Sequence, residues 1–279
     1  MLKQRVITAI VLLALLLPAL MASASWPFAV LTLVMMAAAG WEWGRLNGAG
    51  ATSSLVMGAV VAGACAAALA AGWTHAAPTW LWWLATLVWV LGGAAALRAG
   101  PAGWPLLGRG LRWALGCIAL CVAWLAIASA KAIGLPFILS IFCLVWVADI
   151  AAYFGGRTWG RRKLAPAISP GKSWEGVWTG MVGVLLLATV WVLSEGAPAA
   201  GSASSLFTWL WQRHGLWLTL PILLFLATFS VVGDLVESLV KRAAGMKDSS
   251  GLLPGHGGVL DRIDALLPVF PLAMAMSTL

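Results

Sequence analysis

The chain has 279 residues, of which 62% are hydrophobic and only 9% are charged, and its net charge is +8. A water-soluble domain of this length needs many more charged residues to solvate its surface. The composition therefore excludes a soluble globular protein and indicates an integral membrane protein.

Apolar segments long enough to cross a bilayer recur along the whole chain. A helix needs about 20 residues to cross a hydrocarbon layer of about 30 Å. Nine segments of roughly this length lie at 6–24, 26–41, 54–73, 79–97, 113–130, 136–154, 174–193, 217–240 and 263–279. Their side chains do not alternate with a period of two, which argues against membrane-spanning strands. We therefore expect an all-α, polytopic membrane helix bundle of about nine transmembrane helices, in which Gly and Ala allow close packing.

The chain forms one membrane unit with two parts. Residues 1–130 supply the N-terminal transmembrane helices, and residues 131–279 supply the C-terminal helices with the polar loops that carry the chemistry. Lys3 and Arg5 before the first segment, and the small residues Ala22, Ser23 and Ala24 after it, resemble a secretory signal. We expect this segment to be retained as the first span, because the second span follows at once.

The basic residues predict the orientation, because Lys and Arg accumulate in cytoplasmic loops. With nine crossings and a cytoplasmic N-terminus, every Lys and Arg except Lys131 and Arg213 falls on the cytoplasmic side. We expect a protein of the inner cell membrane whose N-terminus and active site are cytoplasmic. The positive charge is then explained by topology and by contact with anionic lipid, so no nucleic-acid partner is expected.

Acidic residues are few, and most of them lie in the second half of the chain. Of the nine, we set aside Glu42 and the external Glu195. The other seven lie in or beside cytoplasmic helix ends and are Asp149, Glu175, Asp234, Glu237, Asp248, Asp261 and Asp264. Ionisable groups at membrane depth are costly and usually mark a functional site. The chemistry is therefore expected in this half.

One polar helix face stands out in the eighth segment. Asp234, Glu237, Ser238 and Lys241 follow one another at the i, i+3, i+4 and i+7 positions of a helix, so they share a face that must point into the bundle or a wet cavity. For Glu237 and Lys241, a simple ion pair that holds the helix end is an equally good interpretation. Asp149 lies in another apolar segment, about one turn from its cytoplasmic end.

The loop after this helix is rich in glycine and charge. Gly255, Gly257 and Gly258 surround His256, and glycines at this density let backbone N–H groups approach phosphate oxygens. The nearby carboxylates Asp261 and Asp264 suit Mg²⁺, which bridges carboxylates and phosphates. Taken singly, each of these features could also belong to an ordinary tight turn or salt bridge.

A second basic loop contains Gly171, Lys172 and Ser173. These three residues match the end of a Walker A loop, but Pro166 stands where that motif requires glycine, and no parallel sheet is expected. Ser173 is predicted to cap a helix that begins at Trp174, so that Lys172 and the free N–H groups bind an anion. Alternatively, the basic residues of this loop only set the topology.

These loops together resemble the signature of the phosphatidate cytidylyltransferase family, also called CDP-diglyceride synthases. The resemblance runs from about Asp149 to the C-terminus. Its motifs are Ser238-x-x-Lys241-Arg242, Lys247-Asp248, Pro254-Gly255-His256-Gly257-Gly258, Asp261-Arg262-x-Asp264 and Ser169-Pro170-Gly171-Lys172-Ser173-Trp174-Glu175-Gly176. The signature shows no departure in this sequence, so the resemblance implies an active enzyme.

The resemblance implies transfer of a cytidylyl group from CTP to phosphatidic acid within membrane lipid, with Mg²⁺, in phospholipid biosynthesis. It implies that Asp234 and Asp261 hold the metal, with Asp149 and Asp264 as further ligands or supports. The residues expected at the catalytic centre are Asp234, Asp261, Lys241 and Asp248. The residues expected to bind substrate are Lys172, Ser173, Ser238, Arg242, Lys247, His256, Gly257, Gly258 and Arg262. A homodimer is compatible with this kind of enzyme.

Two other functions are weighed against this one. A CTP-dependent polyprenol or lipid kinase would use similar groups but would release CDP instead of pyrophosphate. A secondary transporter would place its acidic residues near the bilayer midplane, in paired repeats with broken helices. Here the acidic residues gather toward one membrane surface, which favours an enzyme.

Overall fold

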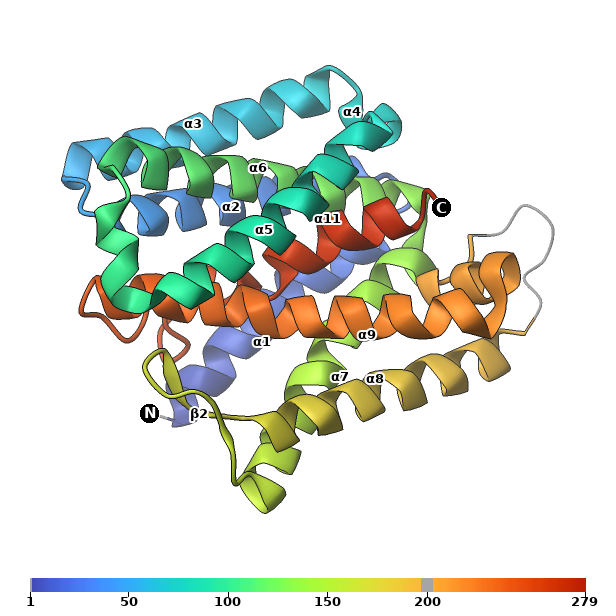
Figure 1. Ribbon diagram of the computed structural model, residues 1–279. Helices are drawn as coiled ribbons and strands as arrows, with labels where there is room; N and C mark the ends of the chain where they lie inside the picture. The colour runs from blue at the N-terminus through green and yellow to red at the C-terminus, as the bar shows by residue number, and fades with distance from the viewer. Residues whose placement is uncertain (1, 197–202) are drawn as a thin grey trace.

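The computed structural model describes residues 2–196 and 203–279, and shows a helix bundle with one small β-hairpin (Figure 1). The helices before the hairpin are α1 (Leu2–Met21), α2 (Trp26–Leu46), α3 (Ala51–Ala70), α4 (Trp73–Ala76), α5 (Thr79–Gly103), the 3₁₀ turn η1 (Trp104–Leu106), α6 (Arg109–Ile133) and α7 (Leu135–Trp159). The hairpin is formed by β1 (Lys163–Ala165) and β2 (Ser169–Ser173), and is followed by α8 (Trp174–Glu195), α9 (Leu206–Ala243), α10 (Leu260–Ile263) and α11 (Leu266–Met276).

Each of the nine predicted segments coincides with a helix, which confirms the helical membrane fold. Seven helices of the described chain are long and apolar enough to cross a membrane, namely α1, α3, α5, α6, α7, α8 and α9. The segment 26–41 corresponds to α2, which has 21 residues. The last segment differs from the prediction, because the chain breaks between α10 and α11. With 11 residues, α11 is about 16 Å long and reaches only part of the way across a bilayer.

The polar loops meet at one end of the bundle. In Figure 1 the start of α1, the β-hairpin and the connection that follows α9 lie at the left, whereas α4 and the C-terminus lie at the right. The hairpin pairs antiparallel, with Lys163 opposite Ser173. The two loops singled out in the sequence therefore lie on the same side of the molecule.

The connection between the predicted spans 174–193 and 217–240, expected as an external loop because Glu195 lies outside, is partly helical. Residues 197–202 of that loop lie outside the described residues, but α9 already begins at Leu206 and bends at Gly215, whose φ of 63° is non-helical. Leu206, Phe207 and Leu210 are fully buried. This apolar first part of α9 packs into the bundle, which explains why it is not a loop.

The connection from α9 to α11 re-enters the bundle. A Cβ atom on Gly233 would lie 2.5 Å from the backbone oxygen of Asp264, so the two backbones are in close contact there. Gly233 lies ten residues before the end of α9 at Ala243, a distance of about 15 Å along the helix. Residues 244–264 thus carry polar groups well below the end of α9.

Small residues allow α7 and α8 to pack closely. A Cβ atom on Gly180 would lie 2.8 Å from the backbone oxygen of Ala148, and one on Gly176 would lie 2.8 Å from that of Ala152. Close backbone approach of this kind provides the van der Waals contact that holds membrane helices together. It also fixes Asp149, on α7, relative to the hairpin that precedes α8.

We expect Gly180→Ala to lower the free energy of unfolding by about 1–3 kcal/mol, because the new methyl group meets a backbone atom that cannot rotate away. Gly63→Ala is the matched control, since Gly63 also lies in a helix but has open space around it. Thermal unfolding in detergent measures both. Equal melting temperatures for the two variants would contradict this account of the α7–α8 contact.

Candidate active site

Lys241 joins two acidic residues from different elements. Its Nζ atom lies 2.6 Å from Glu237 Oε2, one turn earlier in α9, and 2.6 Å from Asp261 Oδ1 in α10. The side chains of Glu237 and Asp261 are 3% and 6% exposed, so this is a buried cluster. The expected Glu237–Lys241 ion pair is present. Lys241 also binds Asp261, so the pair connects the end of α9 to the segment that follows it.

Asp261 is surrounded by donors. Its Oδ2 atom accepts hydrogen bonds from Ser249 N at 2.9 Å, Ser249 Oγ at 2.9 Å and Gly258 N at 2.8 Å. Burial raises the pKa of this carboxyl, but the hydrogen bonds from Lys241, Gly258 and Ser249 outweigh burial and lower the pKa to about 2. Asp261 is therefore a carboxylate at neutral pH.

A second lysine joins the hairpin to α9. Lys172 Nζ, in β2, lies 2.6 Å from Asp234 Oδ2, and Ser238 Oγ donates to Asp234 Oδ1 at 3.1 Å. The side chains of Lys172 and Asp234 are 25% and 30% exposed, so this pair is more open than the Lys241 cluster. Ser173 Oγ accepts from Gly176 N at 3.2 Å, which confirms the predicted cap of α8.

Asp149 and Asp264 lie near the Lys172–Asp234 pair. The charged neighbours of Asp149 are Lys172 and Asp234, and Asp264 lies close enough to all three to interact with their charges. Burial raises the pKa of Asp264 to about 8, and the charges of Asp234 and Asp149 contribute to the rise. Asp264 belongs to the connection before α11, outside the seven helices that could span a membrane.

Asp149 lies deeper than predicted from the sequence. The expected helix ends at residue 154, about one turn after Asp149, but α7 continues to Trp159. Asp149 is thus ten residues, or about 15 Å, before the end of α7. Together with the re-entrant connection, this depth places the acidic cluster below the outer end of the bundle, although Asp149 itself is exposed and Asp234 and Asp264 are half-buried.

Two predicted phosphate-binding arginines stabilise the loops. Arg242 Nε donates to the backbone oxygen of Ile168 at 3.2 Å, which links α9 to the hairpin. Arg262 donates from Nε and Nη2 to the backbone oxygen of His256 at 2.9 and 2.5 Å. Both arginines are exposed, so parts of each guanidinium can still reach a ligand.

The glycine turn between α9 and α10 takes a shape that glycine favours. Gly255 and Gly257 have φ values of 77° and 81°, in the left-handed region. His256 Nδ1 is buried and has no hydrogen-bond partner among the described residues. Lys247 and Asp248 lie just before this turn, are exposed, and make no ion pair within the described part of the chain.

The residues fit a divalent metal ion in the chemistry of their donor atoms. The carboxylates of the cluster are Asp149, Asp234, Glu237, Asp261 and Asp264, and its lysines are Lys172 and Lys241. This excess of carboxylate oxygens is the donor set that Mg²⁺ prefers. Across residues 2–196 and 203–279, however, no group of three such side chains is already close enough to hold a metal. The lysines instead neutralise Asp234 and Asp261.

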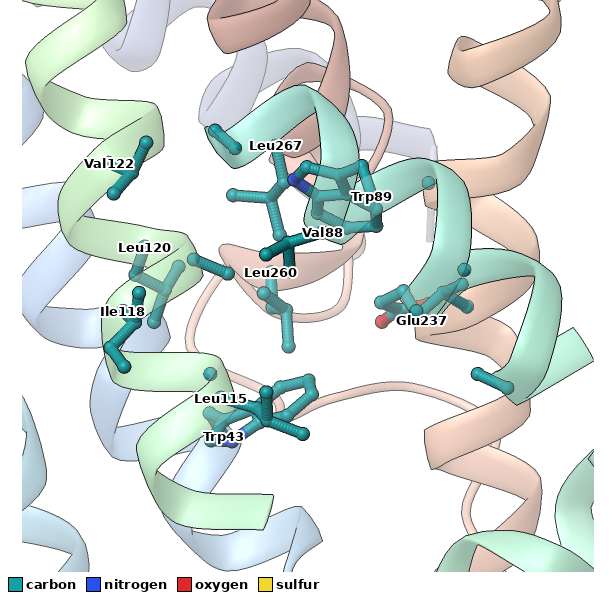
Figure 2. A pocket seen from close by; sticks show the side chains of 18 of the residues that line it. Trp43, Val88, Trp89, Leu115, Ile118, Leu120, Val122, Glu237, Leu260 and Leu267 are labelled. Carbon is teal, nitrogen blue, oxygen red and sulfur yellow. The ribbon is translucent and has the colours of Figure 1, made fainter. Parts of the chain in front are cut away.

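An apolar groove reaches the Lys241 cluster from the side of the bundle. It encloses about 220 Å³ between α5 and α6, and its lining includes Val88, Ile118 and Leu120 (Figure 2). Figure 2 shows Glu237 at the α9 side of this groove, and its Oε1 atom has no hydrogen-bond partner among the described residues. An apolar space thus adjoins the buried charges.

Glu42 is a buried residue near the site that the sequence does not predict to belong to it. Its carboxylate is fully buried at the end of α2 and accepts hydrogen bonds from Ser249, Ser250, Val259 and Leu260, all in the connection after α9. The available signal was its isolation, because no other acidic residue precedes Asp149 in the sequence.

Comparison with known proteins gives a consistent result. The model of the cytidylyltransferase family matches residues 3–279. A phosphatidate cytidylyltransferase of Pseudomonas aeruginosa is 37% identical over 286 residues, which covers 99% of this chain and 97% of the relative. The phosphatidate cytidylyltransferase of Haemophilus influenzae is 48% identical over 140 residues, which covers 50% of this chain and 44% of the relative. That of Bacillus subtilis is 43% identical over 138 residues, which covers 50% of this chain and 46% of the relative.

We expect Lys241→Met to lower the free energy of unfolding by about 3–5 kcal/mol, because it leaves two buried carboxylates without a cation. Lys172→Met is the matched control, and we expect it to cost about 1 kcal/mol or less because its pair is more exposed to solvent. Chemical denaturation measures both. Equal losses in the two variants would show that Lys241 does not hold the buried cluster together.

Proposed function

Because the chain belongs to the cytidylyltransferase family, we propose that it transfers a cytidylyl group from CTP to phosphatidic acid, giving CDP-diacylglycerol and pyrophosphate. One observation carries the proposal: the two signature loops and α9 bring lysines and carboxylates together within a membrane helix bundle. A site of this kind can serve a water-soluble nucleotide and a lipid at once.

The reaction joins two phosphates. An oxygen of the phosphatidic acid phosphate attacks the α-phosphorus of CTP, a new P–O bond forms, and the bond to the β-phosphate oxygen breaks, so that pyrophosphate leaves with the electron pair. The attacking oxygen is already an anion, so no strong general base is needed. Catalysis then depends on reducing repulsion between the two anions and on aligning them.

The lysines supply the positive charge for this task. Lys172 pairs with Asp234, and Lys241 pairs with Asp261. Each lysine can leave its carboxylate and bind a phosphate oxygen of a substrate. At the exposed side of the same loops, Arg242, Lys247 and Arg262 extend the positive surface toward the triphosphate. The N–H groups of the glycine turn and the unpartnered His256 Nδ1 can contact the leaving pyrophosphate.

Mg²⁺ is part of the proposal. Asp234 and Asp261 would hold it, with Asp149 and Asp264 as further ligands or supports, and the carboxyl oxygens that these residues bring to one region support this assignment. When bound, the ion would neutralise phosphate charge. Lys172 and Lys241 would then be released from the two aspartates and become available to the substrates.

The membrane setting fits the two substrates. The apolar lining of the groove between α5 and α6 has the chemistry that an acyl chain requires, and the groove adjoins the buried cluster (Figure 2). We further propose that the protein lies in the inner cell membrane with its polar loops on the cytoplasmic side. This orientation is supported by the location of the basic loops at one end of the bundle and by the solubility of CTP in the cytosol.

The products of CTP turnover test the proposed reaction. We expect purified protein incubated with phosphatidic acid, Mg²⁺ and CTP labelled at the α- or γ-phosphate to move the α-label into lipid and to release the γ-label as pyrophosphate. Transfer of the γ-label into lipid, with release of CDP, would instead identify a lipid kinase and contradict the proposal.

Substitution of the metal-binding aspartates tests the assignment of the site. Asp234→Asn and Asp261→Asn are each expected to reduce kcat by at least about 1,000-fold, because each loses a charged ligand of the metal that would neutralise the reacting phosphates. Glu195→Gln is the control, since Glu195 is the last residue of α8, at the other end of the bundle, and contacts the start of α9 (Figure 1). Turnover above about a tenth of the wild-type rate in either aspartate variant would be incompatible with the assignment.

A further inference from the structure

Glu42 is bound by hydrogen bonds to the segment that carries Asp261 of the candidate active site. Its carboxylate is fully buried in α2, and the described residues place no lysine, arginine or histidine within ion-pair distance of it. A carboxylate buried without a cation is costly unless hydrogen bonds satisfy its oxygens. Glu42 is therefore stable in this position only while its hydrogen-bond donors stay in place.

All four donors come from one distant segment. Oε1 accepts from Ser250 Oγ at 2.5 Å and from Val259 N at 2.9 Å. Oε2 accepts from Ser249 Oγ at 3.1 Å and from Leu260 N at 2.7 Å. These residues flank the glycine turn on both sides, so a single carboxylate fixes where the turn begins and where it ends.

The same contacts lead directly to Asp261. Leu260 precedes Asp261 in the chain, and Ser249 Oγ lies 3.1 Å from Glu42 Oε2 and 2.9 Å from Asp261 Oδ2. A Cβ atom on Gly258 would overlap both Ser249 Oγ and Glu42 Oε1, so the three groups can pack together only around a glycine. Asp261 in turn binds Lys241.

We infer that Glu42 is a positioning residue for nucleotidyl transfer, which fixes both ends of the glycine turn so that Asp261 and Lys241 meet the substrate phosphates in the right geometry. The inference rests on the proposed function, and it assigns a role in the reaction to the N-terminal half of the chain. Glu42 acts through Asp261 and does not touch the reacting atoms.

Glu195 provides a matched comparison within the same chain. Its carboxylate accepts from Ser205 N at 3.0 Å, Ser205 Oγ at 2.5 Å and Thr208 Oγ at 2.6 Å. It therefore also holds the start of a helix through serine, threonine and backbone donors, but its hydrogen bonds within residues 2–196 and 203–279 reach none of the proposed site residues. A purely structural role predicts the same kinetic result for both glutamates.

Glu42→Gln tests the inference. Each oxygen of Glu42 accepts one hydroxyl and one backbone N–H, so the amide NH₂ of glutamine faces the N–H of either Val259 or Leu260 in both orientations. We expect kcat for CDP-diacylglycerol formation to fall about 10- to 100-fold, with a smaller change in the KM for CTP. Hydrogen exchange of the 249–261 backbone should become faster in the unliganded protein.

Glu195→Gln should leave kcat within about twofold of the wild type, because a change of geometry far from the reacting groups does not alter their alignment. We expect this variant to lower the melting temperature as well. A Glu42→Gln protein that folds and keeps the wild-type kcat would overturn the inference, even with faster exchange in the turn. A wild-type protein that forms no CDP-diacylglycerol would instead refute the proposed function, and this inference with it.

Ser250→Ala is the second variant, for the case in which Glu42→Gln does not fold. It removes one donor to Glu42 and leaves the contacts of Asp261 with Ser249, Gly258 and Lys241 in place. We expect kcat to fall by about three- to tenfold. An unchanged kcat in this variant would overturn the inference.

Discussion

The contact of Lys241 with Glu237 and Asp261 is the interaction on which the rest of the site depends. Charged groups inside an apolar bundle must be neutralised by groups of the protein itself, because water and counterions are scarce there. Lys241 meets this requirement for α9 and α10, and Lys172 meets it for β2 and α9. The need for neutralisation thus brings together parts of the chain that are far apart in sequence.

The broken ninth segment explains how charges reach this depth. A continuous helix after residue 263 would carry Asp264 away from α9, whereas the short α10 and the break before α11 bring its backbone against Gly233. Backbone that is not helical is tolerated at membrane depth where it is buried in protein or lines a cavity. The re-entrant connection can therefore present N–H groups and carboxylates at this depth, where we propose that the lipid and nucleotide phosphates meet.

Much of the architecture could be predicted from the sequence, because its signals are local. Apolar length locates the helices, helical spacing places Asp234, Ser238 and Lys241 on one face, and the sequence around Ser173 predicts the cap of α8. The contacts of Glu42 could not be predicted, since they join residues more than 200 positions apart. The depth of Asp149 and the break before α11 depend on packing between helices. This packing cannot be predicted from the apolar length of one segment.

A structure of the protein with a non-hydrolysable CTP analogue and Mg²⁺ tests the central claim most directly. We expect the triphosphate to lie between Lys172 and Lys241, against the turn around His256, with the metal held by Asp234 and Asp261. A nucleotide bound elsewhere, such as on the exposed arginines Arg161 and Arg162, with both lysines still paired to their carboxylates, would contradict it.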